Sequence, residues 1–352
     1  MIFNIGGCNA ENLWTKITES LPNHFLLAGC GNIAPKHIAQ INRIGILKAV
    51  CDIDKEKADS IANANNAHSY TALDAMLNAE EADILVIATP NGIHAQQAII
   101  ALEKGLHVLC EKPMSIHAAD AHRMMDAAGK MNRQLMIIKQ NRYNAPIQEL
   151  KKWISSGRSG RVFSFQLTCL WNRNEDYYKQ ASWRGTKKWD GGILYTQFSH
   201  YIDFVYWLFG EAESIQSMNS NVHHQDQLEF ADQGIVNLRF ASGVLGNIHF
   251  SINGYKHNLE SSLTVLAENG SIRIGGLSCN QVDYQSVKGE NFTNTNSNAA
   301  INQYKAYSGS VSNHAFVYDH FIHCLETNKY DSQSLFEAMK TVDLIERIYA
   351  AA

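Results

Sequence analysis

The sequence predicts two domains of different class: an α/β domain with a doubly wound parallel sheet, then an α+β domain with an open-faced antiparallel sheet and helices on one face. The chain has 352 residues, more than the roughly 100–200 residues of a typical single domain. Continuous apolar runs alternate with helical patterns up to about Ile138. After about Tyr143 they give way to segments in which apolar and polar residues alternate one by one. We therefore expect an N-terminal extension at 1–23, a first domain at 24–142 and a second domain at 143–352.

The first predicted domain is built from apolar runs separated by helical patterns. The runs are HFLLAG (24–29), ILKAVCD (46–52), ADILVIATP (82–90), LHVLC (106–110) and QLMIIKQ (134–140). Runs that are apolar on both faces are typical of parallel strands covered by helices on each side. The helical patterns between them are KHIAQINRIG (36–45), KEKADSIANANN (55–66), IHAQQAIIALEKG (93–105) and AADAHRMMDAAGKMN (118–132). This alternation predicts a βαβ series.

The second predicted domain shows the apolar–polar alternation of a sheet with one covered face. Its segments are RVFSFQLTCLW (161–171), GIVNLRFASGVLGNIHFSI (234–252) and SSLTVLAENGSIRIGG (261–276). An amphipathic helix is expected at 334–351, and the polar residues 289–303 are expected as a mobile loop. We expect Val162, Phe163 and Phe165 on the open face, which is then too apolar for a monomer. The predicted assembly is a homo-oligomer, dimer or tetramer, with the sheet faces in contact.

Composition argues against several classes of function. A formal net charge of -4 with interspersed signs leaves no basic patch for nucleic acid. No stretch approaches the roughly 18 apolar residues of a membrane span, and the first residues lack the layout of a secretory signal, so we expect a cytoplasmic protein. The sequence has 7 cysteines and no C-x-x-C pair, which indicates reduced thiols. His223 and His224 lack the spacing and third ligand of a zinc site, so we predict no metal.

A glycine turn after the first apolar run indicates a dinucleotide site. Gly29, Gly31 and Ala34 match G-x-G-x-x-G/A, and Asp52 ends the next run, about 20 positions beyond the glycines. In a Rossmann fold the missing side chains admit the pyrophosphate to the helix N-terminus, here near Ile33. An acidic residue at Asp52 would hold the ribose hydroxyls and repel the extra phosphate of NADP, and no arginine follows it. The predicted cofactor is NAD.

Further motifs resemble the Gfo/Idh/MocA family of NAD(P)-dependent oxidoreductases, which act on sugars and polyols. The resemblance rests on GCGNIAPKH, ATPNGIHA, LCEKPMSI and GGILYTQFSHYID, and it covers nearly the whole chain from His24. It implies a Rossmann domain followed by an open-faced sheet that carries the substrate and often the oligomer interface. The cofactor ligands that it implies, beside the glycines and Asp52, are Asn32, Ile33, Thr89, Pro90, Asn91, His94, Glu111, Lys112, Gln140, Trp183 and Arg184.

Two longer stretches resemble a narrower branch of the family. KQNRYNAPIQ and WNRNEDYYKQASWRGTKKWDGG are similar to nucleotide-sugar dehydrogenases of surface-polysaccharide synthesis, typified by oxidation at C3 of UDP-N-acetylglucosaminuronate. The resemblance thus implies a sugar or nucleotide-sugar substrate. Polyol-oxidising members carry an aspartate four positions before the histidine of the substrate helix. Here that position is Thr196, followed by Gln197, so these two are expected to bind substrate instead.

Oxidation of a sugar hydroxyl needs a general acid/base within hydrogen-bond reach of the oxygen. The candidates are Lys112, which the resemblance places beside the nicotinamide, and His200 on the second domain's helix. Either can be the base; we prefer His200, with Lys112 polarising the oxygen. The alternative for Lys112 is an exposed strand-end lysine, and for His200 a core histidine, because His200, Phe204 and Leu208 share one helical face.

Other side chains fit a sugar or pyrophosphate, or have ordinary structural roles. Arg142 and Arg173 can hold an anion by forked hydrogen bonds, but loop arginines are often solvated. Tyr178 can stack on a ring or fill the core, and Asn141 is also predicted to bind substrate. Two alternatives to a net dehydrogenase stay open: an NAD-retaining glycosidase or epimerase that oxidises C3 transiently, and a catalytically silent sugar or NAD sensor.

Overall fold

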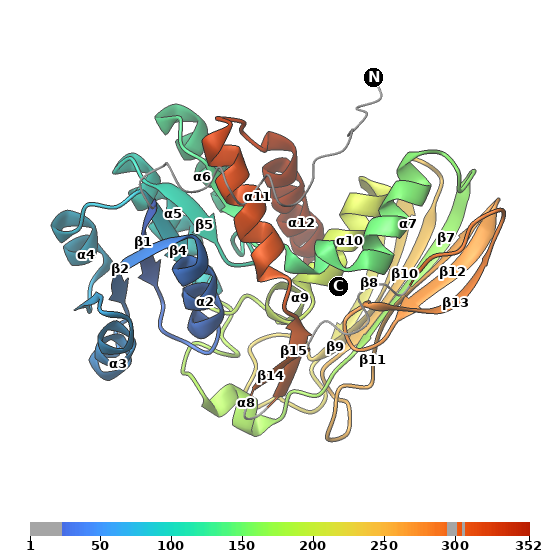
Figure 1. Cartoon of the computed structure of the whole chain (residues 1–352). Coiled ribbons are helices and arrows are strands. Elements are labelled where there is room, and N and C mark those ends of the chain that lie inside the picture. Colours follow the sequence, from blue (N-terminus) through green and yellow to red (C-terminus); the bar gives the residue numbers. More distant parts are fainter. Residues whose placement is uncertain (1–22, 294–300, 305–306) are drawn as a thin grey trace.

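The first domain holds a parallel sheet of the predicted class. The computed structural model describes residues 23–293, 301–304 and 307–352 (Figure 1); the predicted extension lies outside these ranges, except that Asn23 begins the first strand. The strand order is β3-β2-β1-β4-β5-β6, which reverses direction at β1 and β4 as in a doubly wound fold. The strands are β1 (Asn23–Ala28), β2 (Gly45–Cys51), β3 (His68–Tyr70), β4 (Ile84–Ile87), β5 (His107–Cys110) and β6 (Leu135–Ile137).

Helices cover both faces of this sheet because its strands are apolar on both sides. In β1, Phe25 and Leu27 lie in one buried cluster, and Leu26 and Ala28 lie in another. The helices that follow the strands are α2 (Ala34–Ile44), α3 (Lys55–Asn65), α4 (Leu73–Ala79), α5 (His94–Glu103) and α6 (Ala118–Met131), with a short 3-10 turn η1 (Asn91–Ile93) before α5. These helices coincide with the four predicted ones, and α4 is additional.

The last helices of the chain pack against the first domain, although the sequence places them in the expected second domain at 143–352. Helix α11 (His314–Glu326) buries Val317, Tyr318 and Phe321 in the same cluster as Phe25 and the apolar face of α2. It acts as a third helix on that face of the sheet. Helix α12 (Ser332–Ala350) packs on α6 of the first domain and on α10 of the second.

The second domain is a seven-stranded sheet with helices on one side (Figure 1). Its order is β13-β12-β11-β7-β10-β9-β8, and the predicted antiparallel pairing holds except that β7 and β10 run parallel. The strands are β7 (Val162–Leu170), β8 (Ala212–Ser220), β9 (Gln233–Phe240), β10 (Leu245–Ser251), β11 (Glu260–Ala267), β12 (Gly270–Gly275) and β13 (Gln281–Val287). The helical elements are η2 (Gln140–Tyr143), α7 (Ala145–Ser155), α8 (Glu175–Lys179), α9 (Ile193–Thr196) and α10 (Ser199–Phe209).

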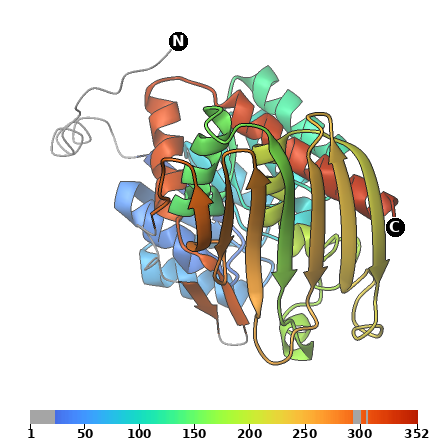
Figure 2. The ribbon, with the colours of Figure 1, turned by 90° about the vertical axis from the view of Figure 1, so that its right-hand side faces the viewer.

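Figure 2 shows the uncovered face of this sheet toward the viewer. The prediction that Val162, Phe163 and Phe165 lie there is wrong for two of the three. Phe165 is buried under the helices, where its ring stacks on Phe209 at 4.4 Å between centroids, and Val162 packs against the same core. The register of β7 against β11 skips Phe163, so this extra residue bulges outward and is 44% exposed.

Part of the predicted mobile loop at 289–303 forms a strand. Strand β14 (Ile301–Tyr304) pairs antiparallel with β15 (Tyr307–Val311) in a two-stranded sheet. Only 301–303 of this strand belong to the predicted loop, and they form backbone pairs with the neighbouring strand. Residues 294–300 of the predicted loop lie outside the described ranges.

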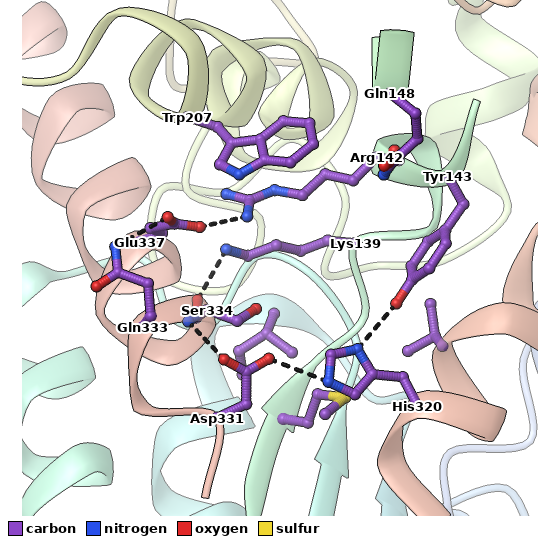
Figure 3. Close-up of a pocket in the computed structure, with 13 residues that line it drawn as sticks. Lys139, Arg142, Tyr143, Gln148, Trp207, His320, Asp331, Gln333, Ser334 and Glu337 are labelled. Carbon is purple, nitrogen blue, oxygen red and sulfur yellow. Dashed lines mark hydrogen bonds and ion pairs between the residues drawn. The ribbon is translucent and has the colours of Figure 1, made fainter. Parts of the chain in front are cut away.

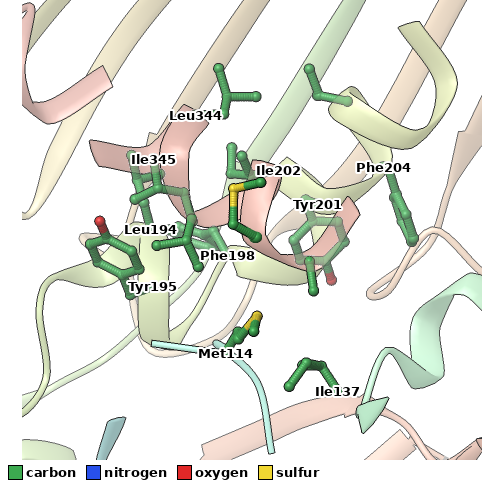
Figure 4. Close-up of a cluster of buried hydrophobic side chains, with 14 of the residues drawn as sticks. Met114, Ile137, Leu194, Tyr195, Phe198, Tyr201, Ile202, Phe204, Leu344 and Ile345 are labelled. Atoms are coloured by element: carbon green, nitrogen blue, oxygen red, sulfur yellow. The ribbon is translucent and has the colours of Figure 1, made fainter. Parts of the chain in front are cut away.

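A buried apolar cluster anchors the site helices of the second domain to the first. Figure 4 shows Met114 and Ile137 from the first domain beside Phe198 and Tyr201 from the second, with Ile345 of α12 completing the contact. All five side chains are less than a tenth exposed. The start of α10 is thereby held against the carboxyl ends of β5 and β6, where the candidate site lies.

Candidate active site

The glycine turn leaves a cradle at the start of α2. Gly29 has φ +98°, and a Cβ there would lie 2.4 Å from the Ala88 carbonyl oxygen, so the strand end admits glycine only. A Cβ on Gly31 would meet nothing within 4 Å, so this backbone faces open space. Ile33, the N-cap of α2, provides no side-chain cap, so the first N–H groups of the helix suit an anion. The turn therefore fits the pyrophosphate of a dinucleotide.

Asp52 lies beside this turn at the carboxyl end of β2. Its carboxylate accepts the Cys30 N–H at 2.8 Å and the Asp54 N–H at 2.9 Å. These bonds fix its orientation where a Rossmann fold binds the ribose hydroxyls. Asn32, also in the turn, donates its side-chain amide to Gln180 of the second domain at 3.3 Å. The residues present thus fit NAD, and Gly29, Gly31 and Asp52 lie where their predicted roles require them.

The loop after β4, where cofactor contacts are predicted, also bonds other loops of the protein. Nδ1 and Nε2 of His94 lie 2.8 Å from the Pro113 carbonyl and 2.9 Å from the Thr89 carbonyl. His94 is buried and thereby holds the loops after β4 and β5 together; the structure gives it no exposed nitrogen for a ligand. The Thr89 hydroxyl donates to Gln97 at 2.6 Å, and Pro90 precedes η1. Asn91 donates to the second domain, as described below.

Glu111 is held by two histidines from different parts of the chain. Its Oε1 lies 3.2 Å from His37 Nε2 on α2 and 3.6 Å from His314 Nε2 on α11. Burial alone would raise the pKa of Glu111, but hydrogen bonds from His314 and His37 hold it well below its ordinary value. His37 also bonds the Tyr318 hydroxyl at 2.9 Å. Within the protein, Glu111 thus ties α11 to α2 beside the lysine loop, and its cofactor role stays a prediction.

Lys112 reaches from the end of β5 into the second domain. Its Nζ donates to the Thr196 carbonyl oxygen at 2.7 Å, so the prediction that it is an exposed strand-end lysine does not apply. Burial lowers the pKa of Lys112, while the Glu111 and Asp190 carboxylates oppose that shift and the Arg184 and Arg173 cations add to it. An amine with a lowered pKa can exchange a proton closer to neutral pH.

His200 lies one turn beyond Thr196, near the start of α10. Burial, and then the charge of Lys112, lower the pKa of His200 to about 3. The imidazole is therefore neutral at physiological pH, but a pKa this low also makes it a weak proton acceptor, so the pKa does not favour His200 over Lys112 as the base. Neither ring nitrogen has a hydrogen-bond partner among the described residues, and neither is fully enclosed. A core histidine normally has its nitrogens bonded, so the exposed nitrogen favours the predicted acid/base role.

Asp190 is a buried carboxylate that sequence reasoning missed. It lies in the loop before α9, is 0% exposed, and accepts the Gly185 N–H at 2.8 Å. Its other carboxylate oxygen bonds the Thr196 hydroxyl. Burial raises the pKa of Asp190 to about 6, against the effect of those hydrogen bonds. The signal in the sequence is its place in KWDGG, directly before the motif that carries the histidine.

Arginines and tyrosines of the second domain surround the lysine from the substrate side. The Arg184 guanidinium lies over the Tyr177 ring at 4.1 Å and donates to the Tyr177 hydroxyl. Gln197 donates to the same hydroxyl at 3.0 Å. Arg173 is buried over Tyr177 at 5.2 Å. Because Gln197 follows the residue that holds Lys112, these contacts place both arginines beside the lysine.

The remaining predicted ligands differ in their surroundings. The Asn141 amide, the Tyr178 hydroxyl and the Gln197 carbonyl oxygen are buried without a hydrogen-bond partner among the residues of the described ranges. Such groups in a native structure call for a ligand or water. Trp183 lies beside Arg184 at 4.8 Å, next to the anion-binding arginine rather than the glycine turn. Gln140 is buried in η2.

Arg142 is not part of this site, contrary to the prediction that it binds substrate. It donates to Asp203 at 2.5 and 2.8 Å and also pairs with Glu337 (Figure 3). Its guanidinium stacks on Trp207 at 4.6 Å. All three nitrogens of the guanidinium thus bond protein carboxylates, and the arginine joins η2 to α10 and α12. Arg142, Trp207, Glu337 and Lys139 line a separate pocket of about 370 Å³.

The Thr196 hydroxyl is likewise unavailable for the predicted substrate bond. It accepts the Asn91 amide at 2.7 Å and donates to Asp190. Asn91 itself also donates to the Asp190 carbonyl at 2.8 Å, so it bonds protein where a cofactor contact was expected.

In the described part of the chain, no three His, Cys, Asp or Glu side chains gather as a metal site, and no helix there is long and apolar enough to cross a membrane.

The sequence matches two family profiles that follow the two domains. Residues 23–139 match the oxidoreductase family with an NAD-binding Rossmann fold, and residues 147–273 match the GFO/IDH/MocA C-terminal domain. Among curated proteins, 2,7-anhydro-N-acetylneuraminate hydratase of Escherichia coli is 29% identical over 65% of this chain. The matched segment covers 64% of that relative's length.

Two solved structures match over nearly the whole chain. The WlbA dehydrogenase of Bordetella pertussis, in complex with NADH and UDP-GlcNAcA, is 34% identical, with a TM-score of 0.83, and the match covers 95% of this chain and 97% of that one. The WlbA dehydrogenase of Chromobacterium violaceum, with the same two ligands, is 32% identical, with a TM-score of 0.86, over 95% of this chain and 94% of the other. The chain therefore belongs to the Gfo/Idh/MocA family of NAD-dependent oxidoreductases, and its cofactor is NAD.

Proposed function

We propose that the protein oxidises the C3 hydroxyl of a nucleotide-linked N-acetyl sugar uronate, with NAD as oxidant. The observation that carries this is the match over nearly the whole chain to two WlbA dehydrogenases in complex with NADH and UDP-GlcNAcA. In this chain Lys112 lies within electrostatic reach of Arg173 and Arg184. Guanidinium groups bind carboxylates by forked hydrogen bonds, so a sugar carboxylate suits this site.

The chain's own residues supply positioning and proton transfer. NAD, when bound, accepts the hydride from the sugar carbon. Neutral His200 accepts the hydroxyl proton, and Lys112, which has three N–H donors, donates a hydrogen bond to the same oxygen while it keeps its bond to the Thr196 carbonyl. Arg173 and Arg184 orient the substrate through its anionic group. The reverse assignment, Lys112 as base, uses the same contacts.

The experiment is to mix the purified protein with NAD and a panel of sugars and to follow NADH absorbance. UDP-N-acetylglucosaminuronate is expected to give NADH in proportion to substrate, with UDP-N-acetylglucosamine and free N-acetylglucosaminuronate as controls. No NADH and no altered sugar with any of them would contradict the proposal.

A redox-neutral reaction is a second candidate, because the Escherichia coli relative is named a hydratase. In that case C3 is oxidised and reduced again within one turnover. The same assay then gives a changed sugar by mass spectrometry without accumulated NADH. The silent sensor is disfavoured by the presence of Lys112 and His200 with altered pKa values.

We further propose that the protein acts in the cytoplasm in surface-polysaccharide synthesis, as its resemblance to that branch implies. The cysteines of the described residues are all free and buried, which supports a reducing compartment. Deletion of the gene in its host should remove a C3-derived amino sugar from the surface polysaccharide. An unchanged polysaccharide composition would contradict this role.

We also propose a homo-oligomer joined through the open sheet face. That face exposes apolar side chains on four strands: Met218 (71%), Ile235 (40%), Leu245 (48%) and Leu266 (44%). An exposed set of this kind is typical of an interface. Light scattering should show a dimer or tetramer, and Ile235→Lys with Leu245→Lys should dissociate it. A monodisperse wild-type monomer at micromolar concentration would contradict the proposal.

A further inference from the structure

The loop before α9 brings a carboxylate to the back of the catalytic lysine. Asp190 is enclosed, and three elements hold it: the Gly185 N–H at 2.8 Å, the Thr196 hydroxyl, and the Asn91 amide at 2.8 Å to its carbonyl. The neighbouring Gly92 N–H donates to the Trp189 carbonyl at 2.9 Å. The loop after β4 and the loop before α9 are therefore joined at this point.

Thr196 transmits this arrangement to Lys112. Its hydroxyl is fixed by Asp190 and Asn91, and its carbonyl oxygen accepts Lys112 Nζ at 2.7 Å. A displaced Thr196 would carry that carbonyl, and hence the amine, with it. The position of the lysine thus depends on a carboxylate to which its amine has no direct hydrogen bond among the described residues.

Asp190 also acts on Lys112 through its charge. Two carboxylates act on the amine, Glu111 and Asp190, and two arginines, Arg184 and Arg173, oppose them. Glu111 is engaged by His37 and His314 on the first domain's side. Asp190 is the negative charge on the second domain's side, where the substrate arginines lie.

We propose that Asp190 is a positioning residue for the reaction: it fixes the Thr196 carbonyl against the Lys112 amine and supplies negative charge on the second domain's side of that amine. The carboxylate comes from six residues earlier in the chain, and Thr196 links it to the lysine. This inference rests on the proposed function only for the role of Lys112 at the reacting hydroxyl.

The expected consequence is a change in when Lys112 loses its proton. Asp190 holds the pKa of Lys112 up against burial and against Arg184 and Arg173. The groups that act on Asp190 are Thr196, Gly185, Arg184 and Lys112, and its own charge reaches Tyr178 and Tyr349. Neutralising Asp190 should therefore lower the pKa of Lys112, whichever of Lys112 and His200 is the base.

The test is competitive amine labelling of Lys112 across pH, read by mass spectrometry, in wild type and Asp190→Asn with NADH present. The Asn side chain keeps the shape but removes the charge. We expect the titration midpoint of Lys112 to fall by roughly one pH unit, the lower end for a nearby charge. Asp232→Asn is the control, because Asp232 is also fully buried and held by backbone N–H groups, yet it is absent from the charges that act on Lys112.

An unchanged midpoint in folded Asp190→Asn, or an equal shift in Asp232→Asn, overturns the inference. Should Asp190→Asn fail to fold, Thr196→Val and Thr196→Ser carry the test. Loss of the hydroxyl weakens the bond that keeps Asp190 ionised, so Val should lower the Lys112 midpoint and Ser should restore it. Equal midpoints in Val and Ser overturn the inference. The labelling needs no sugar, so absent turnover would count against the proposed function alone. With turnover, the limb of the kcat/KM profile that reports Lys112 shifts to lower pH in Asp190→Asn.

Discussion

Two buried charge clusters lie at the boundary between the domains, and they differ in how their charges are balanced. In the first, Arg142 and Lys139 face Asp203 and Glu337. The pKa of Asp203 would rise on burial, but Arg142 and Lys139 lower it to about 2. In the second, the Glu111 and Asp190 carboxylates raise the pKa of Lys112, while burial and the Arg184 and Arg173 cations lower it.

The difference separates a structural cluster from a functional one. Two cations matched by two carboxylates need nothing more, and their removal harms folding. In the second cluster the pKa values of Lys112 and Asp190 are shifted toward neutral pH, which is typical of functional sites. Arginine content alone does not reveal this, since both clusters contain buried arginines.

The largest expected effect is on turnover. Lys112→Met and His200→Ala should each lower the single-turnover rate of NADH formation by about 10²–10⁴-fold, because general acid–base assistance is lost, with NAD affinity nearly intact by calorimetry. Lys139→Met is the matched control: it removes the buried lysine of the first cluster and should lower the melting temperature instead. Near wild-type turnover in His200→Ala would show that His200 is a core histidine and not an acid/base.

Breaking the balanced cluster should reduce stability. Arg142→Met leaves Asp203 and Glu337 buried without their main partner, which should lower the free energy of unfolding by about 3–5 kcal/mol. Arg158→Met, which breaks an exposed pair with Glu290, should cost under about 1 kcal/mol. Urea unfolding followed by circular dichroism measures both. Equal losses in the two variants would show that the buried network is not structural.

Acid should lower the free energy of unfolding through the buried, neutral His200. Because the pKa of His200 is about 3 when folded and near 6.5 when unfolded, the unfolded chain takes up a proton that the native one refuses. Stability is therefore lost as pH falls from about 6.5 toward 3, by about 2 kcal/mol at pH 5 from this residue. Unfolding of His200→Asn should lack this part of the pH dependence, whereas exposed His223→Asn should keep it. Parallel curves for wild type and His200→Asn would contradict the assignment.

The smallest expected effect is on cofactor choice. Asp52→Ala should weaken NAD about tenfold, since a hydrogen bond to a charged group is removed, and should narrow the preference for NAD over NADP by removing repulsion. Calorimetry with both cofactors measures this. Equal dissociation constants of NAD and NADP for the wild type would rule out the role of Asp52.

Local patterns predicted the fold class and the glycine turn, because strand periodicity and glycine spacing are short-range features. Long-range pairing could not be read in the same way. Arg142 and Arg184 are both arginines in non-helical motifs, and only the positions of Asp203 and Glu337, 61 and 195 residues from Arg142, distinguish them. Thr196 resembled a substrate ligand until Asp190 and Asn91 were seen on its hydroxyl. The place of α11 on the first domain likewise depends on contacts with residues far earlier in the chain.

The most direct measurement is calorimetry of UDP-N-acetylglucosaminuronate against UDP-N-acetylglucosamine in the presence of NADH, because the two ligands differ only in the carboxylate. Carboxylate binding by the Arg173 and Arg184 guanidinium groups predicts that the acid binds more tightly, by about tenfold or more for a charge-assisted hydrogen bond. The preference should shrink in Arg184→Gln and persist in Arg158→Met. Equal affinities of the wild type for the two ligands would contradict the view that these arginines select an acidic sugar.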